Sequence, residues 1–331
     1  MTAAATECEI VFVWLGGTLP DWARVSLRLA GQTAGLPTVL ICSRTVGTVD
    51  GIGRQVWLED FYESPEWKWE AKKGARSRFR DGFWRKTFER FIVLEQFATS
   101  GRAAPFFHAE VDNLLFRIND LGPRLDAIGR GCFCPRDARA RGVASLVYVN
   151  EMTALSRMIE VFFDERIAMT SDMEVLGHML QHDSGFYSLP NERVLAPEAS
   201  PAWRTLSVED TGGVFDANAL GQFMFGIDPR NGGICMRNGF PNEYRGCDLW
   251  TLRIHLDIAA GKCTLSRKEG GEGEIHLYNI HVHSKLFHTI ADPLALTRII
   301  DRLNKGQTTL LSVRLVQWRP IRAMLSRMNM S

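Results

Sequence analysis

The sequence predicts an α/β fold in which helices flank a mostly parallel sheet, and three observations support this. Short apolar runs rich in β-forming residues occupy 10–15, 38–42 and 55–58. A helical apolar pattern at 21–34 separates the first two runs. The first run stops at the glycine pair 16–17, which marks the loop before that helix. Elements in this order are typical of a doubly wound sheet, which binds ligands at the carboxyl ends of its strands.

The middle of the chain continues the alternation of strands and helices. The aromatic and basic segment 61–81 has no clean period and predicts a loop with a helical turn. Trp84, Phe88 and Phe91 fall at helical spacing, and the helix that they predict ends at Gly101. The other expected elements are a strand from Pro105 through HAEVDNLLF, a strand at 143–149, helices at 152–163 and 172–180, a strand-like stretch at 275–283 and a short helix after Asp292.

Length and charge bound the class of protein. The chain has 331 residues, 45% of them hydrophobic, so it can bury a large core, and a disordered or fibrous protein is excluded. The 39 basic and 38 acidic residues leave a formal charge of +1. No whole-molecule field attracts nucleic acid, so no nucleic-acid partner is expected, and any recognition of anions must be local.

Cysteine usage and the N-terminal segment both suit a cytoplasmic protein. Seven scattered cysteines form no disulfide framework, and Cys132 with Cys134 fits buried small side chains better than a zinc knuckle. The apolar run 10–15 is too short for a signal peptide or a transmembrane helix.

Two carboxylates interrupt the apolar strand expected after Pro105. Glu110 and Asp112 are two residues apart, so both face one side of a strand or turn toward a ligand at its end. Such a pair suits Mg²⁺ or Mn²⁺, which takes its other ligands from phosphate and water. The alternative is a solvated strand end.

The helix before this strand carries a basic stripe. Lys86 and Arg90 lie one turn apart, and a half-buried arginine needs an anionic partner. That partner is either an internal carboxylate such as Glu89 or Glu95, or the phosphate of a ligand.

These segments resemble a known family. The run from Phe83 to Phe116 is similar to the part of GT-A glycosyltransferases in which a helix with a donor-binding arginine leads into a strand with an acidic metal-binding DXD motif. Here the motif is Glu110-Val111-Asp112, so its first carboxylate is a glutamate. GLPTVLICS resembles the second strand of such folds, and TSDMEVLG resembles an acceptor-side helix with an acidic start. The strings that resemble bacterial polysaccharide and capsule transferases are GGVFDANALGQFMFGIDPRN, NGFPNE and NIHVHSK, and all these segments lie within residues 8–290.

The resemblance implies a Rossmann-like GT-A fold in a single compact unit with nucleotide and acceptor lobes. It divides the chain into a donor-binding half at 1–120, an acceptor and catalytic half at 121–290 and a helical, basic tail at 291–331. The implied activity is that of a metal-dependent, hexosyltransferase-like enzyme that moves a sugar from a UDP- or GDP-sugar to a glycan or a lipid-linked saccharide, with Mn²⁺ or Mg²⁺ stabilising the leaving diphosphate. Polysaccharide biosynthesis is the implied process.

Two other functions remain open. The chain could be a non-catalytic nucleotide- or glycan-binding module of the same fold. It could also be a metal-dependent phosphohydrolase that uses Asp112, His281 and His283, which would need a second metal cluster.

The late motif NIHVHSK supplies further candidates. The resemblance implies that His283 or His281 completes the metal shell, and both histidines share one face of the expected strand. A histidine on a strand is otherwise a hydrogen-bonded side chain. Lys285 suits a diphosphate leaving group.

The remaining candidates are residues that contact the nucleotide and residues that accept a proton. Trp14, Leu15 and Gly16 at the end of the first strand and Ser43 after the second are expected to contact the nucleotide, although Trp14 could also be a core residue. The candidates for a catalytic base are Asp172, Asp216 and Asp228, with Glu243 as a further one. Asp172 could instead be a charge at a helix N-terminus.

The basic tail from Thr309 to Met330 has two interpretations. Its arginines among apolar residues could lie on the inner face of a membrane, which would make the protein peripheral there. The tail could equally be a helix docked on the body of the protein.

Overall fold

The computed structural model describes residues 8–72, 82–101, 105–195, 205–226, 228, 249–269 and 273–307. The basic tail 309–330, the string NGFPNE and Glu243 lie outside these residues. The helices are α1 (Asp21–Thr33), α2 (Glu66–Ala71), α3 (Phe83–Thr99), α4 (Leu121–Ile128), α5 (Met152–Phe163), α6 (Asp172–His182), α7 (Val208–Thr211), α8 (Ala219–Phe225), α9 (Phe287–Ile290) and α10 (Pro293–Asn304). The strands are β1 (Glu9–Trp14), β2 (Thr38–Cys42), β3 (Arg54–Trp57), β4 (Phe106–Ala109), β5 (Asn113–Leu115), β6 (Cys132–Ala138), β7 (Arg141–Gly142), β8 (Leu146–Val149), β9 (Phe186–Leu189), β10 (Gly213–Val214), β11 (Leu252–Asp257), β12 (Lys262–Arg267), β13 (Ile275–Leu277) and β14 (Asn279–His281).

The central sheet confirms the predicted α/β class. Within the described residues its order is β3-β2-β1-β4-β8-β6-β7, and β9 pairs with β6. The strands from β3 to β4 are parallel, whereas β8 is antiparallel to β4 and to β6. The chain moves from β1 to β2 on one side and reaches β4 on the other, which creates a switch point between the carboxyl ends of β1 and β4.

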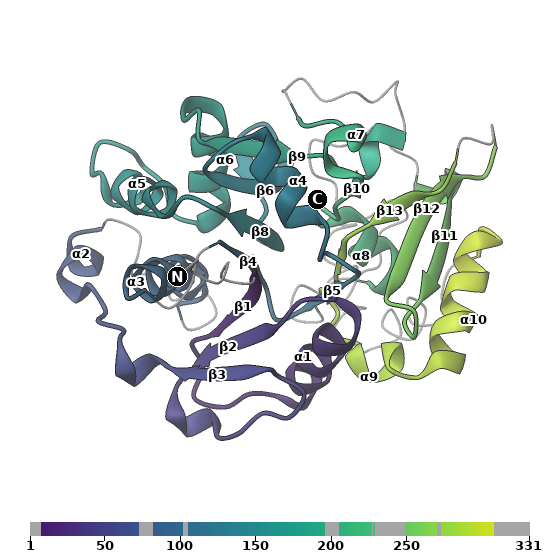
Figure 1. The fold of residues 1–331 in the computed structure, drawn as a ribbon, viewed down its shortest axis with the longest axis horizontal. Helices are drawn as coiled ribbons and strands as arrows, with labels where there is room; N and C mark the ends of the chain where they lie inside the picture. The colour runs from purple at the N-terminus through teal and green to yellow at the C-terminus, as the bar shows by residue number, and fades with distance from the viewer. Residues whose placement is uncertain are drawn as a thin grey trace, which may run out of the picture.

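Helices cover both faces of this sheet (Figure 1). Alternate residues of β1 face opposite ways, as a strand requires. Val11 and Val13 join the core under α3 and α5, whereas Ile10 and Phe12 join the core under α1 and α4. Because both faces are covered, the strand is apolar along its whole length, which explains the continuous run in the sequence.

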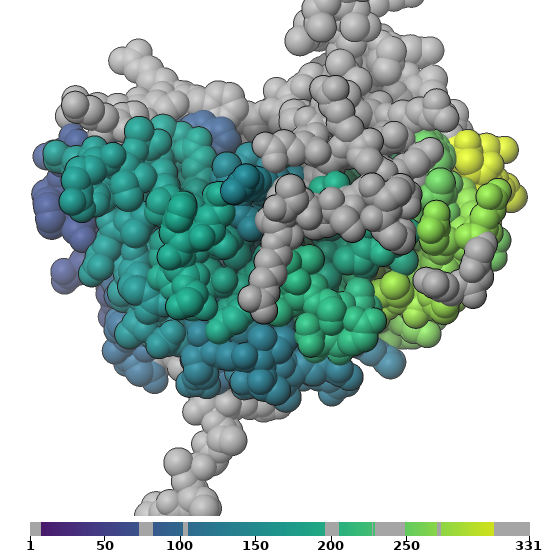
Figure 2. Space-filling view, turned by 90° about the horizontal axis from the view of Figure 1, so that it is seen from above, coloured from purple at the N-terminus to yellow at the C-terminus, as the bar shows by residue number. Residues whose placement is uncertain are grey.

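A second, smaller sheet forms a separate core with α8 and α10. Its strand order is β10-β13-β12-β11. A separate two-stranded pair joins β5, which follows β4 of the central sheet, with β14, which follows β13 of the second sheet. α1 also contributes Val25 and Leu29 to this core, which ties it to the first sheet. Figures 1 and 2 place α2 and α10 at opposite ends of the long axis.

Two predicted strands were wrong in the same way. The strand expected through HAEVDNLLF ends at Ala109 and restarts as β5, so Glu110-Val111-Asp112 is a turn. The stretch 275–283 is two strands in different sheets, and His283 lies beyond the second. In both places the chain leaves one sheet for another, which an apolar pattern does not reveal.

Two smaller expectations can be checked here. Cys132 and Cys134 are buried and free, which confirms that they are small core side chains. Across the described residues, no helix combines the length and the apolar character needed to cross a bilayer.

Candidate functional site

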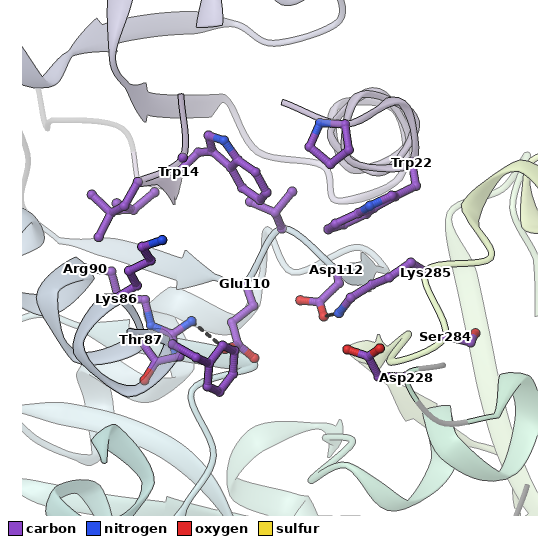
Figure 3. A pocket seen from close by; sticks show the side chains of 16 residues that line it. Trp14, Trp22, Lys86, Thr87, Arg90, Glu110, Asp112, Asp228, Ser284 and Lys285 are labelled. Carbon is purple, nitrogen blue, oxygen red and sulfur yellow. Dashed lines mark hydrogen bonds and ion pairs between the residues drawn. The ribbon is translucent and has the colours of Figure 1, made fainter. Parts of the chain in front are cut away.

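A cavity of about 670 Å³ opens at the switch point of the central sheet (Figure 3). This large cavity has β1 and the turn after β4 on one side and α1, α3 and the segment after β14 around it. Its lining residues are Val13, Trp14, Leu15, Gly16, Pro20, Trp22, Phe83, Lys86, Thr87, Arg90, Glu110, Val111, Asp112, Asp228, Ser284 and Lys285. The position at the carboxyl ends of parallel strands is the one where α/β proteins bind nucleotides.

A second cavity of about 280 Å³ adjoins the first. Glu110 and Asp228 line both cavities, so they form the boundary between them. The other residues of this small cavity are Trp84, Asp137, Arg141, Val143, Ala144, Asp172, Met173, Asn218, Gln222, His281 and His283.

The turn at Glu110-Val111-Asp112 is fixed by three hydrogen bonds. The Glu110 amide donates to the Ser145 carbonyl over 3.1 Å, and the Asn113 amide closes the turn onto the Glu110 carbonyl over 3.1 Å. The Ser26 hydroxyl donates to the Val111 carbonyl. Polar backbone groups that leave a buried strand need such partners, so the turn is held rigidly.

Strand pairing brings His281 to this turn. β14 runs antiparallel to β5 with His281 opposite Asn113, and the Val282 amide donates to the Asp112 carbonyl over 2.8 Å. The register of β14 on β5 therefore places His281 beside the acidic turn, although the two are far apart in the sequence.

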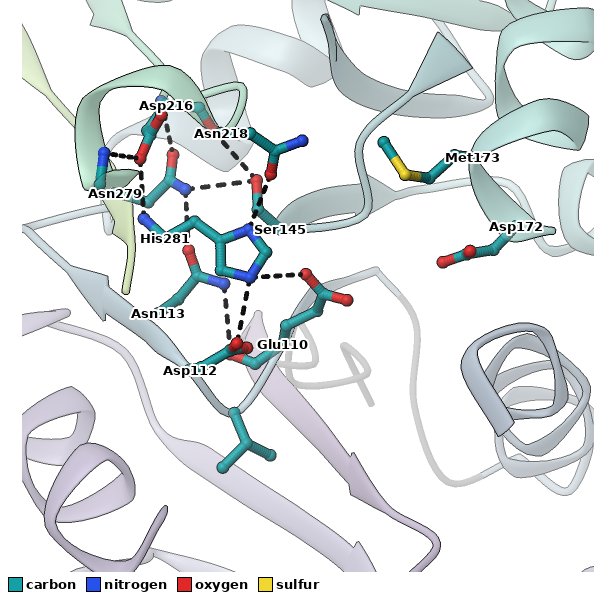
Figure 4. A network of polar contacts seen from close by, with 12 residues as sticks. Glu110, Asp112, Asn113, Ser145, Asp172, Met173, Asp216, Asn218, Asn279 and His281 are labelled. Atoms are coloured by element: carbon teal, nitrogen blue, oxygen red, sulfur yellow. Dashed lines mark hydrogen bonds and ion pairs between the residues drawn. The ribbon is translucent and has the colours of Figure 1, made fainter. Parts of the chain in front are cut away.

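Three side chains converge at the boundary of the two cavities (Figure 4). The Nε2 atom of His281 lies 3.2 Å from Asp112 Oδ2 and 3.3 Å from Glu110 Oε2. One ligand atom from each of the three residues lies within 4.8 Å of the others, and no second such group occurs among the described residues. Two carboxylates and an imidazole are a donor set that fits a divalent cation.

Arg90 joins this group to α6. Its guanidinium pairs with Glu110 Oε1 and with Asp172 Oδ2, and all three side chains are largely buried. Burial raises the pKa of Glu110, but Arg90 and then His281 outweigh it and hold that pKa well below its usual range. Burial raises the pKa of Asp172. Glu110 thus offers one oxygen to Arg90 and the other to His281.

Lys285 brings a second cation to the turn. Its ammonium pairs with Asp112 Oδ2 and lies 5.3 Å from the centre of the Trp22 ring. Trp22 in turn stacks on Phe287 at 6.1 Å. Lys285 has a φ of 60°, which is a rare conformation for a residue with a side chain. In Figure 3 its ammonium and the carboxylates of Asp112 and Asp228 face the same part of the large cavity.

The structure brings together most of the residues singled out in the sequence. Those that line the large cavity are Trp14, Leu15, Gly16, Lys86, Arg90, Glu110, Asp112, Asp228 and Lys285, and Asp172, His281 and His283 line the small one. Ser43 lines neither, and its hydroxyl donates to Glu59. Asp216 also lines neither cavity and is completely buried.

The structure settles two contacts that the sequence left open. The partners of Arg90 are Glu110 and Asp172 rather than Glu89 or Glu95, because the arginine points toward the sheet. His283 is outside the three-residue group, although its ring lies 4.0 Å from that of His281.

Sequence reasoning missed Trp22, Trp84 and Asn218. Trp22 is the second residue of α1, and the apolar pattern of the sequence predicts only that it belongs to an amphipathic helix. Asn218 lies inside the string GGVFDANALGQFMF. The family resemblance of this string gives no role to the asparagine. Only the cavities identify these side chains.

Glu192 is a buried carboxyl group near Asp216 and gives a pH-dependent prediction. It is 1% exposed, and burial, followed by repulsion from Asp216, raises its pKa to about 8. The folded state binds this proton more tightly than the unfolded chain. The contribution of Glu192 to stability is therefore full below its ordinary pKa of 4.5 and is lost as the pH rises through about 8.

Glu192→Gln is accordingly expected to raise Tm at high pH, by on the order of 5 °C near pH 9, with a much smaller difference near pH 5. Thermal unfolding of both proteins at the two pH values measures it. An equal difference at both would contradict a buried, titrating Glu192.

The fold and the site define an α/β protein with a candidate divalent-cation site between two cavities. No protein-family model and no curated protein sequence matches the chain. Several solved structures are similar to it, and three of them are glycosyltransferases by name. They are mouse xyloside xylosyltransferase 1 in its apo form (10% identity, 55% of this chain and 85% of that chain, TM-score 0.37), the galactosyltransferase LgtC with donor and acceptor sugar analogues (12%, 56% and 74%, 0.36) and the glycosyltransferase GlyE of Streptococcus pneumoniae (15%, 57% and 46%, 0.31).

Identities of 10–15% and TM-scores of 0.31–0.37 assign no function to this chain. The function is therefore argued from the residues of the site.

Proposed function

We propose that this protein is a glycosyltransferase that takes a sugar from a nucleoside-diphosphate sugar with the help of a divalent cation. The observation that carries the proposal is the convergence of Glu110, Asp112 and His281 at the boundary of two cavities. A group at this boundary can act on a bond between a donor in one cavity and an acceptor in the other. The resemblance of the sequence to GT-A enzymes supports the same activity.

Glu110, Asp112 and His281 would hold the cation. Glu110 and Asp112 supply carboxylate oxygens, which Mn²⁺ and Mg²⁺ both accept, and the imidazole of His281 favours Mn²⁺ over Mg²⁺. When bound, the cation supplies positive charge for the diphosphate that leaves the sugar. The protein's own cations act on the same group, since Lys285 and Lys86 both line the large cavity.

The large cavity would hold the donor, which we propose is a UDP- or GDP-sugar. Trp14 and Gly16 stand at the end of β1, where a nucleotide base can lie against the indole ring. Trp14 is partly exposed and anchored by its own Nε1, which donates to the Thr18 carbonyl over 3.1 Å. The ring is thus fixed before a ligand arrives.

The small cavity would hold the end of the acceptor glycan. Its volume of about 280 Å³ lies at the lower end of the usual range for ligand pockets, so it suits a single sugar unit. Trp84 offers an apolar face for a sugar ring, and the side-chain amide of Gln222 suits its hydroxyl groups.

Among the three candidate bases that the structure describes, we favour Asp228. It lines both cavities, so it is near both the acceptor hydroxyl and the donor. Asp172 is engaged by Arg90. Asp216 accepts hydrogen bonds from the amides of Leu220, Gly221 and His281, which suits a positioning role.

Calorimetric titration with UDP, GDP and CMP, with and without Mn²⁺, tests the proposal. One diphosphate is expected to bind only with the metal, and Asp112→Ala is expected to weaken that binding by on the order of 100-fold or more. Asp50→Ala removes an exposed carboxylate from the loop before β3 and serves as the matched control.

Two outcomes decide between this proposal and its rivals. Nucleotide binding that ignores both Mn²⁺ and Asp112 would contradict the donor site. Slow hydrolysis of the bound sugar nucleotide without an acceptor is expected of an enzyme, and its complete absence would favour a binding module.

A further inference from the structure

His281 is held by the segment that begins α8. The amide of His281 donates to Asp216 Oδ2 over 2.9 Å, and the same carboxylate accepts the amides of Leu220 and Gly221. A Cβ atom on Gly221 would lie 1.9 Å from the His281 carbonyl oxygen, so only glycine lets α8 approach β14 this closely. Asp216 therefore fixes the backbone of His281.

Asn218 contacts the ring of the same histidine. It is the residue before the first turn of α8, where an asparagine ordinarily caps the free amides of the helix. It makes no such cap, and its φ of 81° places it in the left-handed region. Instead, its Oδ1 lies 2.9 Å from His281 Nδ1 (Figure 4). A residue kept in a strained conformation and turned away from its usual role needs a reason.

Hydrogen-bond chemistry fixes which nitrogen of His281 carries the proton. Asn218 Nδ2 lies 3.3 Å from Asp137 Oδ2, and a carboxylate only accepts. The amide nitrogen of Asn218 therefore faces Asp137, and its oxygen faces His281. Since an amide oxygen only accepts, Nδ1 of His281 is the donor. In a neutral ring Nε2 then carries the lone pair, and it faces the oxygens of Glu110 and Asp112, an arrangement that a shared cation satisfies.

Asp137 is itself buried, with a side chain only 2% exposed, and pairs with Arg141 over 3.2 Å. A series of contacts therefore runs from Arg141 through Asp137 and Asn218 to His281. Each member orients the next, and the last member faces the two carboxylates.

We propose that Asn218, oriented by Asp137, is a positioning residue that keeps the proton of His281 on Nδ1 so that Nε2 is available to a divalent cation. This inference rests on the proposed function in one respect, namely that a cation binds there. Without Asn218, the neutral ring gains by placing its proton on Nε2, where two carboxylates accept it. A cation would then have to displace that proton, which weakens binding.

Two substitutions separate this role from a structural one. Asn218→Ala and Asn218→Gly both remove the amide, but glycine tolerates a φ of 81° and alanine does not. Both variants are expected to bind Mn²⁺ about 10–100-fold more weakly, while the alanine variant is expected to lose more stability than the glycine variant. Calorimetry measures the affinity and thermal unfolding of the metal-free protein measures stability. Arg117→Gly, at an exposed residue with a φ of 39°, controls for the change in backbone strain.

The tautomer of His281 gives a readout that needs neither metal nor activity. ¹⁵N chemical shifts of histidine-labelled, metal-free protein near pH 9 are expected to show the proton on Nδ1 in the wild type and on Nε2 in both variants. An affinity that falls only in the alanine variant, in step with its Tm, would overturn the proposal. An Nε2-protonated His281 in the wild type would overturn it too. If the wild type binds no Mn²⁺, the proposed function fails on that point, and the tautomer still decides the role of Asn218.

Discussion

Arg90→Met is expected to lower the free energy of unfolding by about 3–5 kcal/mol near neutral pH, because it leaves two buried carboxylates without their cation. Glu110 and Asp172 both pair with this guanidinium, and the side chain of Asp172 is only 4% exposed. Methionine fills similar space without a charge, so packing changes little. Chemical denaturation of the two proteins measures the difference.

The loss should shrink as the pH falls. Without Arg90, burial raises the pKa of both carboxyl groups, so each takes up a proton more readily in the folded variant than in the unfolded chain. The variant therefore regains stability relative to the wild type between neutral pH and about pH 5. For the same reason, Asp172→Asn added to Arg90→Met is expected to recover part of the loss.

Arg85→Met is the matched control on the same helix. Arg85 pairs with Glu66 and Glu89, but its side chain is 30% exposed and that of Glu66 is 59% exposed. Such a surface pair contributes at most about 1 kcal/mol. An equal loss in both variants would mean that Arg90 acts as an ordinary surface arginine, and the link between α3 and the acidic turn would be wrong.

The apolar periodicity of the sequence predicted the first strands and helices and the helix α5. The bounds of α5 were predicted without error, and β1, α1 and β2 were within about one residue of the observed elements. These segments have apolar periods that persist through their length. Strands β6 and β9 were not predicted. Their pairing, antiparallel between β6 and β8 and parallel between β6 and β9, is decided by tertiary contacts.

The residue types of the site were predictable, whereas their partners were not. Glu110 and Asp112 stood out because carboxylates interrupt an apolar run. That His281 meets them, with His283 beyond the group, follows from the register of β14 on β5, which no local pattern encodes. The partners of Arg90 depend in the same way on where α6 begins relative to the turn.

The roles of Asn218 and Trp22 were hidden for a related reason. An asparagine before a helix predicts a cap, and a tryptophan on α1 predicts a core residue. Each acts on a residue of the segment 279–285, through the contacts to His281 and Lys285. Contacts across such distances in the chain require the three-dimensional structure.

Lys285→Met is expected to lower kcat by about 10²–10³-fold with sugar nucleotide and acceptor present, because it removes a preorganised cation from the place where the diphosphate gains charge. Asp112 and the face of Trp22 hold the ammonium in advance, so it needs little reorganisation during the reaction. Mn²⁺ binding without nucleotide should change in the opposite direction. Since the ammonium competes for Asp112 Oδ2, its removal is expected to leave the affinity for Mn²⁺ unchanged or to increase it.

These opposite effects separate a role in catalysis from a role in building the metal site. Steady-state kinetics gives kcat, and calorimetry with Mn²⁺ alone gives the affinity. Lys285→Arg keeps the charge without the compact ammonium and should retain more activity than the methionine variant. A Lys285→Met protein that loses Mn²⁺ affinity along with activity would place Lys285 among the residues that shape the acidic turn. Weaker metal binding would then explain its loss of activity.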